Sequence, residues 1–317
     1  MPVGLRVGHN RGTCGMAVNP RACPPTCRRE CMRSLRGQKF DREPLSVTWI
    51  HGSPPAERNA DPPVQAHWHD EHTVLLRQNK AIHYEAPFFY LLFGARRAVL
   101  IDTGATSRAE QFPVGRVVDA LIGGWLSVHP RDGYELLVLH SHSHGDHVAG
   151  DGQFRGRSGT VVVGAGRDAA WDYLGLAEQP ESARPVDLGE RVLEALATPG
   201  HDAAAITYYD PWTGFLLTGD TVYRGRLYIN DWTAFRRTID RLVDLTARWD
   251  VTHVLGCHIE MTRQPGTDYP VGTTYQPDEP PLEMQPGHLL AVRAALAAAG
   301  SSPARYTDRD FILWPVR

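Results

Sequence analysis

The residues best suited to chemistry in this sequence are four histidines and one aspartate packed into eight consecutive positions. Imidazole and carboxylate groups are the ligands that borderline divalent metals prefer. His142 and His144 lie two positions apart, so both side chains can point the same way from an extended segment. Asp146 and His147 follow as the chain turns and can reach a second ion. The run predicts a metal site, with His140, at the end of the preceding strand, in a structural role.

Three distant residues have the same ligand chemistry. His201 follows the tight turn Thr-Pro-Gly, Asp220 follows the apolar run Phe-Leu-Leu-Thr-Gly, and His258 follows Val-Leu-Gly-Cys. Each comes just past the C-terminal end of a predicted strand, where loops converge and sites are commonly built. Together with the histidine cluster, they are expected to complete two sets of metal ligands.

Short apolar runs alternate with helical stretches from about residue 73 onward, and these elements must position the ligands. Apolar runs bounded by turn residues predict strands at 73–76, 88–93, 98–101, 134–139, 160–163, 191–197, 204–209, 215–218, 251–255 and 311–314. Helices are expected at 107–122, 231–248 and 289–299, and 263–286, rich in Pro, Gly and Thr, predicts a long surface loop. Blocks of strands separated by helices indicate a layered α/β or α+β protein.

The histidine run resembles the His-x-His-x-Asp-His signature of the metallo-β-lactamase superfamily. The downstream order Pro-Gly-His201, Thr-Gly-Asp220 and then His258 matches that family as well, and Asp102-Thr-Gly resembles its early strand-end Asp motif, usually structural. The resemblance uses five separate motifs over roughly residues 73–260, so it is specific. It implies a four-layer αββα sandwich with the metal ions at one edge, between the two sheets.

Carried over residue by residue, the resemblance implies two ligand sets joined by one bridging carboxylate. The first set is His142, His144 and His201, the second is Asp146, His147 and His258, and the bridge is Asp220. The ions are expected to be two divalent metals, zinc in the first instance. Iron and manganese are alternatives because a ligand set of nitrogen and oxygen atoms accepts each of them.

The resemblance implies a dinuclear hydrolase in which a bridging hydroxide attacks an ester, thioester or lactone carbonyl. Asp146 is expected to accept or pass on a proton. Tyr223, three residues after Asp220, is a candidate donor to the developing oxyanion, with simple packing as the alternative. Many β-lactam-hydrolysing relatives carry Cys in place of Asp220, so the sequence favours the branch resembling glyoxalase II and the lactonases.

Two other functions remain open at the level of sequence. Persulfide-dioxygenase-like relatives use one iron at the first site, and a non-catalytic metal-binding protein would keep the site for stability. The full second ligand set, including His258, favours the hydrolase. The substrate is also open, because only Arg224 and Arg226 follow Asp220 closely enough to hold a glutathione carboxylate.

Composition narrows the class of partner. Of the 317 residues, 42% are hydrophobic and 22% are charged, and the formal net charge is −3. These values are ordinary for a soluble protein and disfavour a nucleic-acid binder, which usually carries a strongly basic domain. No apolar run is long enough to suggest a membrane span. We therefore expect a small-molecule substrate, no nucleic acid and no membrane, and the oligomeric state stays open.

The first 45 residues differ from the remainder. The first forty contain seven Arg and one Lys against one acid, and four of the five cysteines lie in the first 31 positions. We expect residues 1–45 to be a disordered basic tail or the product of a misassigned start, with Met32 as the alternative initiator. Residues 46–317 are expected to form one domain. Its single cysteine, Cys257, is typical of a reducing compartment, which favours a cytoplasmic location.

Overall fold

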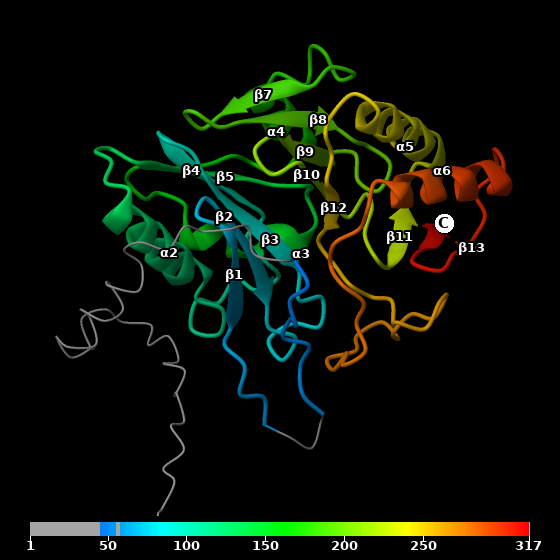
Figure 1. The fold of residues 1–317 in the computed structure, drawn as a ribbon, viewed down its shortest axis with the longest axis horizontal. Coiled ribbons are helices and arrows are strands. Elements are labelled where there is room, and N and C mark those ends of the chain that lie inside the picture. Colours follow the sequence, from blue (N-terminus) through cyan, green and yellow to red (C-terminus); the bar gives the residue numbers. More distant parts are fainter. Residues whose placement is uncertain (1–44, 55–57, 317) are drawn as a thin grey trace, which may run out of the picture. The chain divides into compact units, whose positions relative to one another are not determined.

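The computed structural model of the chain describes residues 45–54 and 58–316 (Figure 1). The predicted basic tail falls almost wholly outside these residues, so the division of the chain near residue 45 stays a prediction. Within the described part, no helix combines the length and apolar character that crossing a bilayer requires.

The first sheet has six strands in sequential order, and its hydrogen bonding changes from antiparallel to parallel half-way across. β1 to β4 pair antiparallel, whereas β4 with β5 and β5 with β6 pair parallel. Consequently β4 and β5 end at the same edge, where the histidine run begins. The strands are β1 (Val64–Asp70), β2 (Thr73–Gln78), β3 (Phe88–Phe93), β4 (Arg97–Ile101), β5 (Glu135–Leu139) and β6 (Thr160–Val162).

The second sheet has five strands in the order β12-β10-β9-β8-β7. β10 and β12 run parallel, and the other pairs run antiparallel. The residues that follow β10 and β12 therefore leave the sheet side by side. The strands are β7 (Arg184–Asp187), β8 (Val192–Ala197), β9 (Ile206–Asp210), β10 (Phe215–Gly219) and β12 (His253–Gly256).

Alternation of side chains along the strands produces the layers. In β3, Tyr90 and Leu92 point into a core shared with Tyr208 of the second sheet. The intervening Leu91 packs on the other face, in a core shared with Val118 of α2 (Val114–Val128). Because successive strand residues face opposite sides, a run that is apolar throughout can be buried on both faces.

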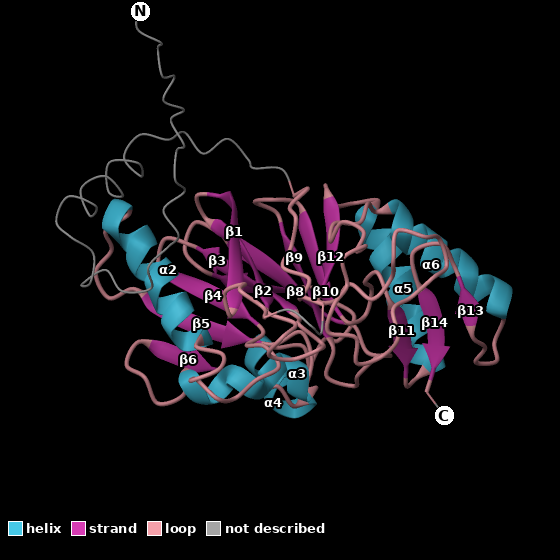
Figure 2. Ribbon diagram, turned by 90° about the horizontal axis from the view of Figure 1, so that it is seen from below, coloured by secondary structure: helices cyan, strands magenta, loops and turns pink. Residues whose placement is uncertain are grey.

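The outer face of the second sheet is covered in the same way. Leu216 of β10 shares a core with Phe235 of α5 (Trp232–Thr246) and Leu289 of α6 (Gly287–Ala299). Figure 2 shows the two sheets between α2 on one side and α5 with α6 on the other. A small third sheet lies beside these helices, made of β11 (Arg226–Ile229), β14 (Ile312–Pro315) and β13 (Tyr306–Thr307). The fold is the predicted αββα sandwich.

Most predicted strands are confirmed, and the differences have local causes. The helix expected from residue 107 begins at Val114, directly after Pro113, since proline fits the start of a helix and not its interior. Four strands were not predicted, among them the short strands β11 and β13 of the third sheet. β1 reads Val-Gln-Ala-His-Trp-His-Asp, an apolar–polar alternation that is typical of a strand and that the prediction omits. β7 is a four-residue strand that contains a proline.

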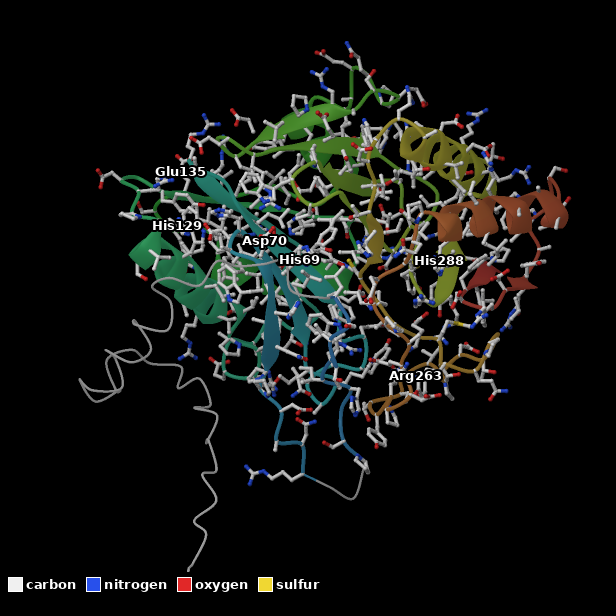
Figure 3. The ribbon with its side chains drawn as sticks, in the orientation of Figure 1. His69, Asp70, His129, Glu135, Arg263 and His288 are labelled. Carbon is white, nitrogen blue, oxygen red and sulfur yellow. The ribbon has the colours of Figure 1, made fainter. Side chains whose placement is uncertain are left out.

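The long loop at 263–286 is confirmed, since no helix or strand lies in that range. A buried ion pair fixes it to the first sheet: the Arg77 guanidinium of β2 donates to both carboxylate oxygens of Glu279, at 2.5 and 2.6 Å. Figure 3 shows Arg263 near the beginning of this loop. The short helices α3 (Gly145–Val148), η1 (Ala149–Gln153) and α4 (Arg167–Leu174) complete the fold.

Candidate metal centre

The predicted ligands converge at the edge where the two sheets meet. His142 and His144 follow β5 of the first sheet, and Asp146 and His147 lie on α3, a single helical turn that comes next. The other three residues follow strands of the second sheet: His201 after β8, Asp220 after β10 and His258 after β12. Each sheet alone supplies only part of the cluster.

The ligand atoms separate into two groups, and within each group they lie within 4.8 Å of one another. The first group is His142, His144 and His201, and the second is Asp146, His147, Asp220 and His258. These are the two sets that the sequence predicts, and each takes residues from both sheets.

Spacing within the groups fits metal coordination. His201 Nε2 lies 3.1 Å from His144 Nδ1, and His258 Nε2 lies 3.3 Å from His147 Nε2. His258 Nε2 is also 3.3 Å from a carboxylate oxygen of Asp146. Four ligands placed tetrahedrally about 2.0–2.1 Å from an ion are separated by about 3.3–3.4 Å. The residues present therefore fit an ion in each group.

Hydrogen bonds fix which nitrogen of each imidazole faces the site. His147 Nδ1 donates to Asp102 Oδ2 at 2.9 Å, and His201 Nδ1 donates to the Tyr228 carbonyl at 2.8 Å. His258 Nδ1 likewise donates to the Glu85 carbonyl at 3.2 Å. Since each Nδ1 faces its acceptor, each Nε2 faces the cluster and can bind an ion once it carries no proton.

His142 reaches the same state through a serine. The Ser141 hydroxyl donates its one proton to Asp102 Oδ2 at 2.8 Å, so it accepts from His142 Nδ1 at 3.0 Å. His142 Nε2 and Asp220 Oδ1 are then buried with no hydrogen-bond partner. Buried polar atoms without a partner are rare in native proteins. His142 Nε2 points at the ligand cluster, and Asp220 Oδ1 lies 3.3 Å from His258 Nε2, so both atoms are placed to bind a cation.

Two of the ligands carry the charge that an ion requires. Burial, helped by the neighbouring His147, lowers the pKa of His142 well below its usual range. Burial acts to raise the pKa of Asp220, but His258 and His147 outweigh it and hold that pKa well below the ordinary value. A neutral imidazole and an ionised carboxylate are the forms that bind metals. At two others, His147 and His258, burial acts to lower the pKa but Asp220 outweighs it and holds the pKa well above the usual value, so an ion must displace a proton from each.

Glycine allows the two sheets to approach so closely. Gly219, directly before Asp220, has a φ of +53°, and a Cβ there would meet the Ser141 side chain at 2.6 Å. The Thr-Gly-Asp motif therefore needs glycine for close packing of the two sheet edges as well as for the turn.

Asp102 supports the cluster without belonging to either ligand group. It is fully buried at the end of β4 with a φ of +69°. Its carboxylate accepts from the Ser141 backbone N–H at 2.7 Å, from the Ser141 hydroxyl and from His147. Cys257 lies beneath it in the core, with Sγ 3.5 Å from Asp102 Oδ2. His140 also lies outside both groups, and its ring contacts Asp151 at 2.8 Å.

A cavity of about 330 Å³ opens over the cluster. Tyr228 and Trp232 follow the Asp220 strand, where wall residues are expected. Tyr228 lines the cavity, whereas Trp232 packs in the core with α6. The other wall residues beyond the predicted ligands and Tyr223 carried no clear signal in the sequence, and they are Glu85, Asn230, Glu260 and Val316.

Tyr223 lines the cavity, but its hydroxyl is already used. That hydroxyl is buried and donates to the backbone carbonyl of Arg226, with Glu260 Oε2 3.2 Å away. The Tyr228 hydroxyl accepts from Arg226 Nε at 2.9 Å. In the part of the chain that the structure describes, we find no acceptor for its own proton. The catalytic role of Tyr223 stays a prediction.

Glu71, His72 and His129 form another group of potential ligands, at the far end of the first sheet. Figure 3 shows His129 at the end of α2. Trp125 Nε1 donates to His72 Nδ1 at 3.1 Å. Because indole only donates, His72 Nδ1 must be unprotonated, and the Nε2 proton is shared with Glu71, 3.2 Å away. This group is satisfied by hydrogen bonds and does not need an ion.

Comparison with known proteins agrees with this geometry. A sequence model of the Metallo-beta-lactamase superfamily matches residues 85–249, which is 165 of the 317 residues. The chain belongs to this superfamily. The solved structure of the metallo-β-lactamase DIM-1 superposes on this chain with a TM-score of 0.51 at 13% sequence identity. The match covers 76% of this chain and all of the DIM-1 chain, so the two share the metallo-β-lactamase fold.

Curated relatives of this chain include hydroxyacylglutathione hydrolases. The Methylococcus capsulatus protein is 29% identical over 153 residues, 47% of this chain and 56% of its own. The Anaeromyxobacter dehalogenans protein is 31% identical over 141 residues, 43% of this chain and 46% of its own. The chain thus spans about half the length of the curated relatives that it matches.

Proposed function

We propose that this chain is a hydrolase that uses two divalent metal ions, zinc in the first instance, to cleave an ester, thioester or lactone. The position of Asp220 carries the proposal. Its Oδ2 lies 3.7 Å from His201 Nε2 in the first group and 3.6 Å from His147 Nε2 in the second. Its Oδ1 lies 3.3 Å from His258 Nε2. One carboxylate thus faces both groups, as a bridging ligand would.

When bound, two such ions supply a hydroxide nucleophile at neutral pH and polarise the scissile carbonyl. Asp146 is the residue best placed to handle a proton, since it borders the cavity and its side chain is 20% exposed. Burial acts to raise the pKa of Asp146, but His147 and His258 outweigh it and hold that pKa well below the usual value. Asp146 therefore stays a carboxylate, the form that binds a metal ion, and its proposed role in proton transfer rests on its place at the cavity.

Two tyrosines are candidates to donate a hydrogen bond to the negative charge that develops on the substrate. Tyr223 can donate only if its bond to the Arg226 carbonyl breaks. Tyr228 holds its oxygen in place by accepting from Arg226 and keeps its own proton for a ligand. We propose Tyr228 as the better-placed donor.

Two further observations support hydrolysis. The curated relatives bear the name hydroxyacylglutathione hydrolase, so related chains are named for thioester cleavage. The second ligand group is complete, with Asp146, His147 and His258 all directed at one point. A mononuclear iron oxygenase would not need that group.

The test combines metal analysis with a substrate panel. We expect about two zinc ions per purified chain, with turnover of a lactone, a thioester or an aryl ester. Asp146→Ala should abolish turnover while the protein still folds, whereas Asp240→Ala, an exposed carboxylate on α5, should behave like the wild type. One iron per chain without hydrolysis would transfer the assignment to the oxygenase. Folded protein that binds no metal would overturn the proposal.

A further inference from the structure

The cavity wall beyond the metal cluster presents carboxylates and no cation. Glu85 and Glu260 line it, and among the described residues no lysine or arginine does. Carboxylates at the wall of a substrate cavity repel anionic ligands and attract cationic ones. The charge of the wall therefore bears on which substrates can enter.

The two arginines nearest the cavity are already engaged. Arg226 is buried and donates to Glu260 Oε1 at 2.7 Å, to Asp268 Oδ2 at 2.6 Å and to the Tyr269 carbonyl at 2.7 Å. Its Nε donates to the Tyr228 hydroxyl. Four of its five N–H groups are thus used. Holding a substrate carboxylate would require breaking this network.

Arg224 and Lys80 are no more available. The Arg224 guanidinium pairs with Asp310. Lys80 is 2% exposed and donates to the Tyr84 carbonyl at 3.0 Å. Lys80 and Arg226 line a second, small cavity of about 10 Å³, roughly the space of one water, which Glu85 and Glu260 also line. Neither cation lines the larger cavity over the metal cluster.

Glu85 is the carboxylate that remains available to a ligand. Its side chain is partly exposed and accepts a hydrogen bond from the Tyr84 hydroxyl. In the described part of the chain we find no ion pair for it, whereas Glu260 is neutralised by Arg226. Glu85 also lies close to the reacting centre, because its backbone carbonyl accepts from the imidazole of His258.

We propose that the substrate carries an amino or ammonium group, and no carboxylate, on the part remote from the scissile carbonyl, with Glu85 as the group that binds this cation. The inference rests on the proposed hydrolase and names its substrate class. A glutathione thioester, whose tripeptide carries two carboxylates, suits this wall poorly. The chain would thus differ in substrate from the hydrolases that it resembles.

The experiment uses the full, metal-loaded chain and three acetyl thioesters that differ in charge. Acetylthiocholine is cationic, S-acetyl-N-acetylcysteamine is uncharged and S-acetylglutathione is anionic. The released thiol is followed with one reagent, and oxygen esters of the same three charges are run in parallel. We expect kcat/KM to fall from the cationic to the uncharged to the anionic substrate, by about five- to tenfold at each step, and less at high salt.

Variants at one position assign the effect. Glu85→Gln should reduce the ratio of kcat/KM for the cationic substrate to that for the anionic one by about tenfold, and Glu85→Lys should reverse the order. Glu110→Gln removes an exposed carboxylate that does not line the cavity and should leave the ratio as in the wild type. An unchanged ratio in both Glu85 variants would overturn the inference.

The failures of the two proposals are distinguishable. If no thioester or ester of any charge is turned over, the hydrolase itself is refuted, and the inference falls with it. If the wild type turns over S-acetylglutathione fastest, the hydrolase stands and the inference is wrong.

Discussion

Asp102→Asn tests whether a buried carboxylate sets the metal affinity of the second group. Asp102 accepts from His147 Nδ1 at 2.9 Å and so leaves His147 Nε2 free for an ion. Asparagine has nearly the same size and tolerates the positive φ of +69° at this position. Its amide, however, offers one acceptor oxygen where the carboxylate offers two, and that oxygen is needed by the Ser141 N–H. His147 then has a reason to carry its proton on Nε2, which blocks coordination.

The expected magnitude follows from that change of partner. Loss of a carboxylate that orients a ligand histidine typically costs 10–100-fold in metal affinity, which is about 1.4–2.7 kcal/mol. Titrating the metal-free protein with Zn²⁺ against a chromophoric chelator resolves the two affinities. We expect the second group to weaken by this amount and the first group to weaken as well, because Asp102 Oδ2 also accepts from the Ser141 hydroxyl that orients His142.

A matched control separates this effect from general loss of stability. Asp151 is also buried, and its carboxylate contacts the His140 ring at 2.8 Å, but His140 is in neither ligand group. Asp151→Asn should lower the free energy of unfolding by about 1–3 kcal/mol and leave both zinc affinities unchanged. Two wild-type affinities in Asp102→Asn would refute the orienting role of Asp102. Equal weakening in both variants would refute its specificity.

Three further predictions concern buried groups. Arg191→Met leaves Asp210 unpaired in the core, because both partners are about 1% exposed. In a denaturant titration, it should lower the free energy of unfolding by about 3–5 kcal/mol. Arg96→Met breaks an exposed ion pair and should lower it by less than about 1 kcal/mol. Burial lowers the pKa of Lys80 to about 8. Between about pH 8 and 10 the unfolded chain therefore binds more protons than the folded chain, and the free energy of unfolding should rise with pH by up to about 3 kcal/mol. Denaturation of Lys80→Met across this range should lack that rise, and a rise equal to the wild type would contradict the lowered pKa. Tyr223→Phe should lower stability by about 1 kcal/mol with kcat within about threefold of the wild type; a hundredfold loss of kcat in a folded variant would instead establish Tyr223 as catalytic.

Local patterns in the sequence determined much of this protein. The strand over 88–93 is apolar at every position and has the predicted bounds, because a fully buried strand needs no polar face. The order of His142, His144, Asp146, His147, His201, Asp220 and His258 indicated the family, which the match over residues 85–249 confirms. Ligand type and order survive in the sequence because each ligand lies in the short segment that follows a strand.

Tertiary structure decided what faces what. The sequence places Asp220 about 70 residues beyond the histidine run, and only the packing of the two sheets brings its carboxylate against both ligand groups. The same packing uses the Tyr223 hydroxyl to bind a backbone carbonyl, a choice that the residue's position in the sequence leaves open. It also pairs Arg226 with Glu260 and places Glu85 at the cavity wall. Side-chain direction and the pairing of charges depend on neighbours far away in the sequence, so no local pattern carries them.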